Sequence, residues 1–375
     1  MDITQALPLL GGLSPQQFMT RHWQKKPLLV RGAVPGLVPL LTRSELFELA
    51  SRDQVESRLV SQAKGWALRR GPFARRALPA LSRPGWTLLV QGVDLHDAGA
   101  HDLLQQFRFL PEARLDDLMI SYASDQGGVG PHFDSYDVFL LQAQGRRRWR
   151  IGRQQDLSLR EGLPLKVLAR FEPEQEYLLE PGDMLYLPPR YAHDGIAQGE
   201  CQTYSIGLRS PARAELAREL LQRLSDDAAD SAGGDVYRDA HQLATATPGA
   251  IPSQLQQFSR SALHAVLDDP LALDRALGEY LTEPKPNVWF EGGGSRTAMR
   301  RLRLDRRSRM MYDDRHVFIN GESYRASGRD AVLMHALADR RCLAPAELAA
   351  ASELARSLLR SWCDAGWVHA TKAER

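Results

Sequence analysis

Apolar and polar positions alternate with different periods in successive parts of the chain. Up to about residue 110, helical spacing and short strand-like runs are mixed. The predicted helices cover 15–23, 44–62 and 100–108. The predicted strands cover 28–30, 66–69 and 87–91. The first helix has a clear start signal, because Ser14 supplies a hydroxyl cap, Pro15 suits the first turn and Gln17 completes a capping box.

Between about 116 and 209 short strand-like runs dominate the pattern. They cover 118–122, 138–142, 147–151, 176–179, 184–187 and 203–208. The turn signals between them are Gly127-Gly128, residues 143–145, Pro181-Gly182-Asp183 and Pro188-Pro189. Regular short strands separated by such turn signals favour a β-sandwich or barrel over a parallel sheet.

After Pro211 the helical period returns. Helices are predicted over 212–224, 253–268, 271–282, 328–340 and 345–365, and a solvated loop over 225–234. Strands are predicted near 287–290, 315–319 and 367–369, with Asn320-Gly321 as a hairpin turn. The order of elements after about residue 286 indicates a separate α+β module, which we interpret as a winged helix.

Composition narrows the class of protein without identifying it. The chain of 375 residues suits two or three domains, and its formal net charge of +2 predicts no strong attraction to nucleic acid or membrane. Cys201, Cys342 and Cys363 form no CxxC pair, so neither a zinc pattern nor a disulfide framework is expected. No apolar run of about 18 residues occurs, and we therefore expect a cytoplasmic protein without a membrane partner.

The segment Gly130-Pro131-His132-Phe133-Asp134 suggests a metal site. On a strand, residues i and i+2 point to one face, so the His132 imidazole and the Asp134 carboxylate can aim at one point. Two histidines and one carboxylate form the facial triad of non-haem iron sites. His193, which follows a turn, a strand and Pro188-Pro189, is well placed as the third ligand. By itself, however, the HxD triplet is also compatible with ordinary core or surface residues.

Arg147 is the second element of the predicted site. It lies 13 residues after Asp134, on the strand that the turn at 143–145 would create. A 2-oxoglutarate enzyme needs a buried cation to pair with the far carboxylate of its cosubstrate. A guanidinium can bind that carboxylate through two parallel hydrogen bonds. Strand alternation should turn Arg147 one way and its neighbours Arg146 and Arg148 the other, although all three arginines can also be read as surface residues.

Four segments resemble the JmjC-type 2-oxoglutarate oxygenases, and specifically their ribosomal-oxygenase branch. They are residues 18–28, 117–122, 127–152 and 180–194. The third, GGVGPHFDSYDVFLLQAQGRRRWRIG, is the longest and most specific. By position, His132, Asp134 and His193 match the iron ligands, and Arg147 matches the partner of the 2-oxoglutarate carboxylate. Lysine is common in the family at this last position.

The resemblance implies further roles for residues near the metal segment. Ser121 becomes a candidate for a second hydrogen bond to the cosubstrate. Tyr136 and Asp137 become candidates for the substrate channel, because an aromatic face and a carboxylate suit a guanidinium. Core packing and a turn cap are equally compatible with these two residues.

The resemblance also implies a fold and a domain order. We expect a mainly β core of the double-stranded β-helix, or cupin-like jelly-roll, type, with helical additions and a C-terminal α+β winged-helix-like module. The expected parts are an N-terminal α/β segment on the core (1–95), the oxygenase core (96–211), a helical dimerisation region (212–285) and the C-terminal module (286–375).

The implied activity is hydroxylation of a protein. The cofactor would be Fe(II), with 2-oxoglutarate and O₂ as cosubstrates, and the reaction would be 3-hydroxylation of an arginine in a large-subunit ribosomal protein. Lysine demethylation and histidine hydroxylation would use the same iron chemistry, so the site residues do not separate these outcomes. A different class of protein, a non-catalytic metal-binding cupin that acts as a nucleic-acid-binding regulator through its tail, remains the alternative.

Residues 295–309 form an arginine-rich run. It holds seven arginines and one acid, Asp305. One interpretation is a contact with ribosomal RNA. The other is a solvated edge whose charges pair with acids such as Asp313 and Asp314.

Overall fold

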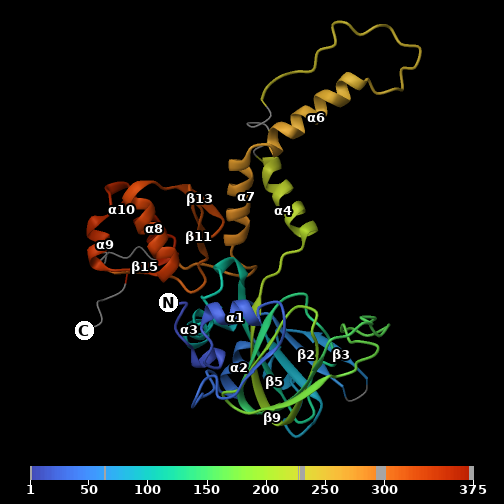
Figure 1. Cartoon of the computed structure of the whole chain (residues 1–375), viewed down its shortest axis with the longest axis vertical. Helices are drawn as coiled ribbons and strands as arrows, with labels where there is room; N and C mark the ends of the chain where they lie inside the picture. Colours follow the sequence, from blue (N-terminus) through green and yellow to red (C-terminus); the bar gives the residue numbers. More distant parts are fainter. Residues whose placement is uncertain (1, 63–64, 227, 229–232, 293–300, 371–375) are drawn as a thin grey trace. The chain divides into compact units, whose positions relative to one another are not determined.

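The chain forms two compact units, Met1–Ser210 and Pro211–Arg375. The computed structural model, drawn in Figure 1, describes residues 2–62, 65–226, 228, 233–292 and 301–370. Among the described residues, no helix is long and apolar enough to cross a membrane.

The first unit is built around a nine-stranded antiparallel sheet. The strand order is β1-β8-β6-β9-β5-β4-β2-β3, and β7 pairs with β6. The strands are β1 (Leu28–Val30), β2 (Ser57–Ser61), β3 (Ala67–Arg70), β4 (Trp86–Val90), β5 (Leu115–Ala123), β6 (Val138–Gly152), β7 (Gln175–Leu179), β8 (Met184–Leu187) and β9 (Ala192–Leu208). The long strands β6 and β9 pair along most of their length.

Helices of the first unit supply part of its main apolar core. They are α1 (Pro15–Arg21), α2 (Arg43–Leu49) and α3 (Ala98–Gln105). Short 3₁₀ turns cover Pro8–Leu10, Arg75–Ala77, Val93–Leu95 and Glu112–Arg114. The predicted capping box at the start of α1 is confirmed, because Gln17 N donates to Ser14 Oγ (3.2 Å) and Ser14 N to Gln17 Oε1 (3.0 Å).

The two faces of the sheet have different uses. Leu118, Ile120 and Tyr122 on β5 belong to the main apolar core, together with residues of α1, α2 and α3. The alternate residues Met119 and Ser121 line a cavity. Since side chains alternate along a strand, that cavity lies on the opposite face from the core.

The predicted turn at 143–145 and the predicted helix 44–62 of the first unit are wrong. No turn interrupts β6 at 143–145; the strand continues through two irregularities of register, and Gly145 has a φ of +63°. A Cβ there would lie 2.1 Å from Glu200 O, so glycine permits the close approach of β9. The predicted helix 44–62 ends at Leu49, because Ser57–Ser61 forms β2 between β3 and β4.

Among its described residues, the second unit holds three long helices followed by the α+β module. Its helices are α4 (Arg213–Asp226), α6 (Ser253–Leu267), α7 (Pro270–Thr282), α8 (Gly328–Arg340), α9 (Pro345–Ala350) and α10 (Glu353–Asp364). Its strands are β10 (Leu302–Leu304), β11 (Met310–Tyr312), β12 (His316–Ile319), β13 (Glu322–Arg325), β14 (Cys342–Leu343) and β15 (Val368–Ala370). They form two three-stranded sheets, β14-β10-β15 and β11-β12-β13.

The predictions for this unit have mixed outcomes. The hairpin turn is confirmed: Ile319 pairs with Glu322, and Asn320 and Gly321 both have positive φ. No strand forms at 287–290, and the predicted helix 345–365 is two helices, the second capped by Ser352. Of the predicted loop 225–234, residues 225 and 226 belong to α4, while 227 and 229–232 lie outside the described residues.

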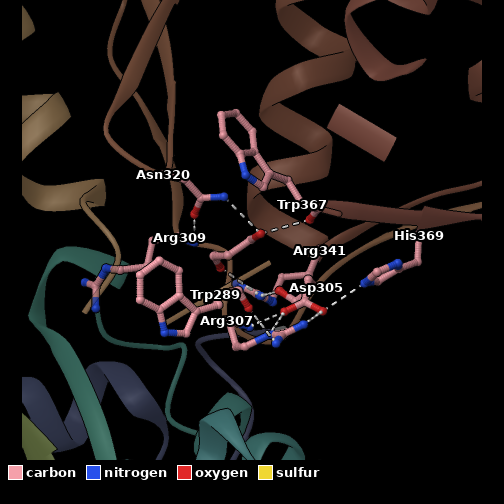
Figure 2. A network of polar contacts seen from close by, with 9 residues as sticks. Trp289, Asp305, Arg307, Arg309, Asn320, Arg341, Trp367 and His369 are labelled. Carbon is pink, nitrogen blue, oxygen red and sulfur yellow. Dashed lines mark hydrogen bonds and ion pairs between the residues drawn. The ribbon is translucent and has the colours of Figure 1, made fainter. Parts of the chain in front are cut away.

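A buried polar network, shown in Figure 2, ties the α+β module together. Asp305 is 8% exposed. Its carboxylate accepts hydrogen bonds from Arg307 Nε (2.7 Å), while His369 Nε2 lies 2.8 Å from it. Arg341 donates to the backbone oxygens of Asp305 and Ser308. The carboxylate of Asp305 and the carbonyls beside it therefore all have donors from within the module.

The arginine-rich run contributes to this network. Arg307 binds Asp305 and also donates to Trp289 O, and Arg309, only 9% exposed, donates to Leu281 O. These two arginines thus bind groups of the second unit, Arg307 within the α+β module and Arg309 on α7, and do not form the solvated edge that one interpretation predicted. Residues 295–300 lie outside the described residues, and a contact of the run with ribosomal RNA stays a prediction.

Candidate metal centre

His132, Asp134 and His193 converge in the first unit. Their potential ligand atoms all lie within 4.8 Å of one another. Asp134 Oδ2 is 3.8 Å from His193 Nε2, and the two imidazole centroids are 4.2 Å apart. Two imidazoles and one carboxylate in this arrangement suit a divalent transition metal.

Backbone hydrogen bonds hold the metal segment against β9. His132 N donates to His193 O (3.0 Å), and His193 N donates to His132 O (2.8 Å). Asp134 O accepts from Arg190 N (2.7 Å), in the turn between β8 and β9. The prediction that 132–134 lie on a strand is wrong, because His132 and His193 form only an isolated bridge. The bridge nevertheless brings the distant ligands together.

The imidazoles are oriented with Nε2 available to a metal. Nδ1 of His132 lies 2.8 Å from Gly130 O, and Nδ1 of His193 lies 3.0 Å from Tyr191 O. A carbonyl can only accept, so each Nδ1 carries the proton and each Nε2 keeps its lone pair. Burial, and next the neighbouring His132, lower the pKa of His193, which favours the neutral form that a metal needs.

Arg147 lies in the same cavity as the three metal-ligand candidates. The cavity has a volume of about 270 Å³, and Ser121 lines it as well. Arg147 is 5% exposed and donates through Nη1 to Ser121 Oγ (3.0 Å). Its Nε and Nη2 atoms are buried without a hydrogen-bond partner among the described residues. A buried cation with two unused donors is matched by a ligand carboxylate.

The residues present fit both the iron and the 2-oxoglutarate that the resemblance implies. His132, Asp134 and His193 offer the donor set of a non-haem iron site, and Arg147 with Ser121 offers donors for a carboxylate. The structure therefore brings together all five residues that the sequence singled out for the metal and the cosubstrate. Their ligand roles stay a prediction.

Trp149 was missed by the sequence reasoning. Its ring lies 5.8 Å from the His193 ring and 5.7 Å from the Arg147 guanidinium carbon. A Cβ at Gly195 would lie 2.6 Å from this indole, so glycine on β9 makes room for it. The available signal was alternation, because Trp149 is two residues from Arg147 on the same strand.

Of the two substrate-channel candidates, Tyr136 lines the cavity and Asp137 does not. Tyr136 lines the cavity, and burial, then the charge of Asp134, raise the pKa of its hydroxyl, which therefore stays protonated. Asp137 is fully buried elsewhere and accepts hydrogen bonds from Gln24 Nε2 (3.0 Å) and Tyr186 Oη (2.5 Å). Asp137 is thus a structural residue, whereas Asp116 and Asp117, which the sequence reasoning did not single out, line the cavity.

Two family models match the chain. Residues 102–216 match the JmjC domain, and residues 265–369 match the ROXA-like winged helix. The predicted cupin-like β core and the predicted winged-helix module are therefore confirmed.

Curated and solved relatives agree with these matches. The chain is 36% identical to the ribosomal protein uL16 3-hydroxylase of Escherichia coli over 72% of its own length and 71% of that protein. The crystal structure of E. coli YcfD superposes with a TM-score of 0.83 at 29% identity, covering 94% of this chain and 97% of that one. YcfD with cobalt and 2-oxoglutarate, described as a ribosomal oxygenase, superposes with a TM-score of 0.79 at 28% identity, covering 95% and 98%. The chain therefore belongs to the JmjC-domain ribosomal oxygenases.

Proposed function

We propose that this chain is an Fe(II)- and 2-oxoglutarate-dependent dioxygenase that hydroxylates a large-subunit ribosomal protein in the cytoplasm. The observation that carries the proposal is a single cavity that holds the His132–Asp134–His193 cluster and the partly unsatisfied Arg147. The uL16 hydroxylase and the cobalt-bound and 2-oxoglutarate-bound relative support it.

Each part of the cavity has a task in this reaction. Bound Fe(II) supplies the activation of O₂ that couples decarboxylation of 2-oxoglutarate to succinate with hydroxylation of a carbon. Arg147 and Ser121 bind the distal carboxylate of the cosubstrate and so fix its orientation. The carbonyls of Gly130 and Tyr191 hold the two imidazoles in position. No side chain needs to transfer a proton.

The wall of the cavity favours arginine as the target residue. Asp116, Asp117 and Tyr136 line it beside the metal cluster. Carboxylates attract a guanidinium, and the face of a phenol ring can stack on it. We therefore assign 3-hydroxylation of an arginine of uL16 to this chain, ahead of lysine demethylation and histidine hydroxylation.

The test is mass spectrometry on peptides that tile uL16. The chain is incubated with Fe(II), ascorbate, O₂ and 2-oxoglutarate, with His132→Ala and Arg147→Ala in parallel. We expect one peptide to gain one oxygen atom, the gain to disappear with His132→Ala, and fragmentation to place the hydroxyl on C3 of an arginine.

Other outcomes separate the alternatives. A hydroxyl on histidine, or loss of a methyl group from a methylated lysine peptide, would replace the assigned target. Succinate formed without modification of any uL16 peptide would support the oxygenase activity but exclude uL16 as its substrate. Bound iron with neither product would favour the non-catalytic, nucleic-acid-binding cupin.

The helical region supports a homodimer. α4 packs against α7, and residues of these helices and α6 form only a small apolar core. Large apolar side chains remain exposed on the same helices: Leu221, Leu255, Phe258, Leu263, Leu267 and Leu273. Apolar surface of this kind is typical of a subunit interface.

Light scattering coupled to size-exclusion chromatography tests the dimer. We expect the full chain to elute with the mass of two copies and a chain that ends at Pro211 with the mass of one. Leu263→Glu, at a side chain that is 65% exposed, should also weaken the dimer. A truncated chain that remains dimeric would contradict the assignment of 212–285 to dimerisation.

A further inference from the structure

Residues 57–93 carry an unusual charge distribution. They hold seven basic residues and no acidic residue: Arg58, Lys64, Arg69, Arg70, Arg75, Arg76 and Arg83. The whole chain has 48 basic and 46 acidic residues, which leaves 41 basic and 46 acidic residues outside this segment. The segment therefore carries a concentrated positive charge, whereas the rest of the chain is slightly acidic.

The fold places this charge at one margin of the sheet. The segment forms β2, β3, the turn Arg75–Ala77 and β4, and β3 is the last strand of the sheet (Figure 1). Five of its arginines are exposed, and none of them has an ion pair among the described residues: Arg69, Arg70, Arg75, Arg76 and Arg83. We call these five residues the basic edge.

Aromatic rings hold two arginines of the basic edge. The guanidinium of Arg69 lies 5.5 Å from the centroid of Phe73, and Arg69 Nη1 also donates to Ala77 O (3.2 Å). The guanidinium of Arg75 lies 4.8 Å from the centroid of Phe47. A stacked guanidinium loses mobility but keeps N–H groups along its rim for an anion.

A continuous row of residues joins the basic edge to the cavity. In register, Ser121 on β5 faces Leu89 on β4, Leu89 faces Arg58 on β2, and Arg58 faces Arg70 on β3. Directly opposed residues of antiparallel strands point to the same face, and the first three line the cavity. Arg70 therefore lies on the cavity side of the sheet, about 14 Å from Ser121 at three strand spacings.

The surroundings of these charges favour a phosphate backbone over a lipid surface as the occupant. Arg58 and Arg70 are like charges directly opposed across β2 and β3, which is unfavourable. Arg58 has partners in Gln91 Oε1 (2.7 Å) and Glu56 (3.9 Å), whereas exposed Arg70 has no ion pair among the described residues and can bind an anion. None of the large hydrophobic side chains exposed among the described residues falls within 57–93, so an apolar anchor for a bilayer is lacking there. Arg307 and Arg309 of the other arginine-rich run, by contrast, bind groups of their own unit.

We propose that the basic edge binds RNA through its phosphates and sets the cavity beside the RNA-bound ribosomal protein that it modifies. RNA binding itself follows from the charge and the geometry of the edge. The identification of that RNA as ribosomal rests on the proposed function. The contacts are to the phosphate backbone, so binding should be strong at low salt and indifferent to base sequence.

Fluorescence anisotropy with labelled single-stranded RNA tests the proposal on the full chain without iron or 2-oxoglutarate. Its result is thus independent of oxygenase activity. The variant is Arg70→Gln, Arg76→Gln and Arg83→Gln together, which spares the two stacked arginines. The matched control is Arg21→Gln, Arg170→Gln and Arg329→Gln, at three exposed arginines elsewhere. Thermal melting confirms that both variants fold.

We expect the triple variant to lose at least about tenfold in affinity, and its slope of log affinity against log salt to fall by about two. The control should stay within about twofold of the wild type. No binding by the wild type, or an equal loss in both variants, would overturn the proposal. Binding to vesicles of phosphatidylserine without binding to RNA would overturn it as well.

Discussion

The polar cluster around Asp305 in the second unit and the one around Arg147 in the first unit differ in whether their hydrogen bonds are complete. Around Asp305, both carboxylate oxygens have donors, from Arg307 and His369, and Arg341 binds the adjacent carbonyls (Figure 2). In the cavity of the first unit, Arg147 is just as buried, but its Nε and Nη2 atoms have no hydrogen-bond partner among the described residues.

The difference separates a structural cluster from a binding site. A buried donor that lacks a partner costs about 1–3 kcal/mol, and two such nitrogens on one guanidinium that lines a cavity are matched by an anionic ligand. The Asp305 cluster is complete within its own module and needs nothing further. The Arg147 cluster lies in a cavity with the metal-ligand candidates, and an anionic ligand would satisfy it.

The largest effect should come from His132→Ala. Removing one of three ligands should lower hydroxylation by at least about 10³-fold, while stability changes little because His132 packs beside a cavity. The absorption spectrum of bound Co(II) should change in parallel with the activity. A variant that retains normal Co(II) binding and turnover would show that the cluster is not the metal centre.

Asp305→Ala should act on stability instead. The change leaves Arg307 and the other donors of the network without their acceptor, at a cost of about 3 kcal/mol to the winged-helix module. Urea unfolding should show this loss, while the affinity of the folded chain for 2-oxoglutarate stays normal. Reduced affinity of this variant for 2-oxoglutarate would contradict a purely structural role for the Asp305 cluster.

The pH dependence of Asp305 should give a smaller effect. Burial raises the pKa of Asp305, but hydrogen bonds from Arg307 and His369 outweigh it and lower the pKa from 3.8 to about 2. Because the folded pKa is the lower one, the ionised group contributes up to about 2 kcal/mol above pH 4, and this is lost as pH falls toward 2. The stability difference between the wild type and Asp305→Asn should shrink over that interval; a constant difference would contradict it.

Local signals in the sequence predicted several elements correctly. The capping box at Ser14 and the Asn320-Gly321 turn depend on neighbouring residues alone, and both are present. The grouping of His132, Asp134 and His193 could be expected because the two segments have distinctive residue types at fixed spacing.

The errors arise where distant partners decide the local structure. Residues 57–61 have a helical pattern, but β3 and β4 pair with them and make a strand. β6 runs through a segment that looks like a turn, because β9 pairs with both of its halves. The lining of the cavity by Asp116 and Asp117, and the contacts of Asp305 with the distant residues His369 and Arg341, depend on tertiary structure that no local pattern contains.

The most direct test of the comparison is calorimetric binding of 2-oxoglutarate to the Co(II)-loaded chain. The variants are Arg147→Ala, Arg146→Ala as the exposed neighbour on the same strand, and Asp305→Ala. We expect one cosubstrate per chain, an affinity loss of about 100-fold for Arg147→Ala alone, and normal binding by the other two. Equal affinity of Arg147→Ala and the wild type would contradict the assignment of the unsatisfied arginine to the cosubstrate.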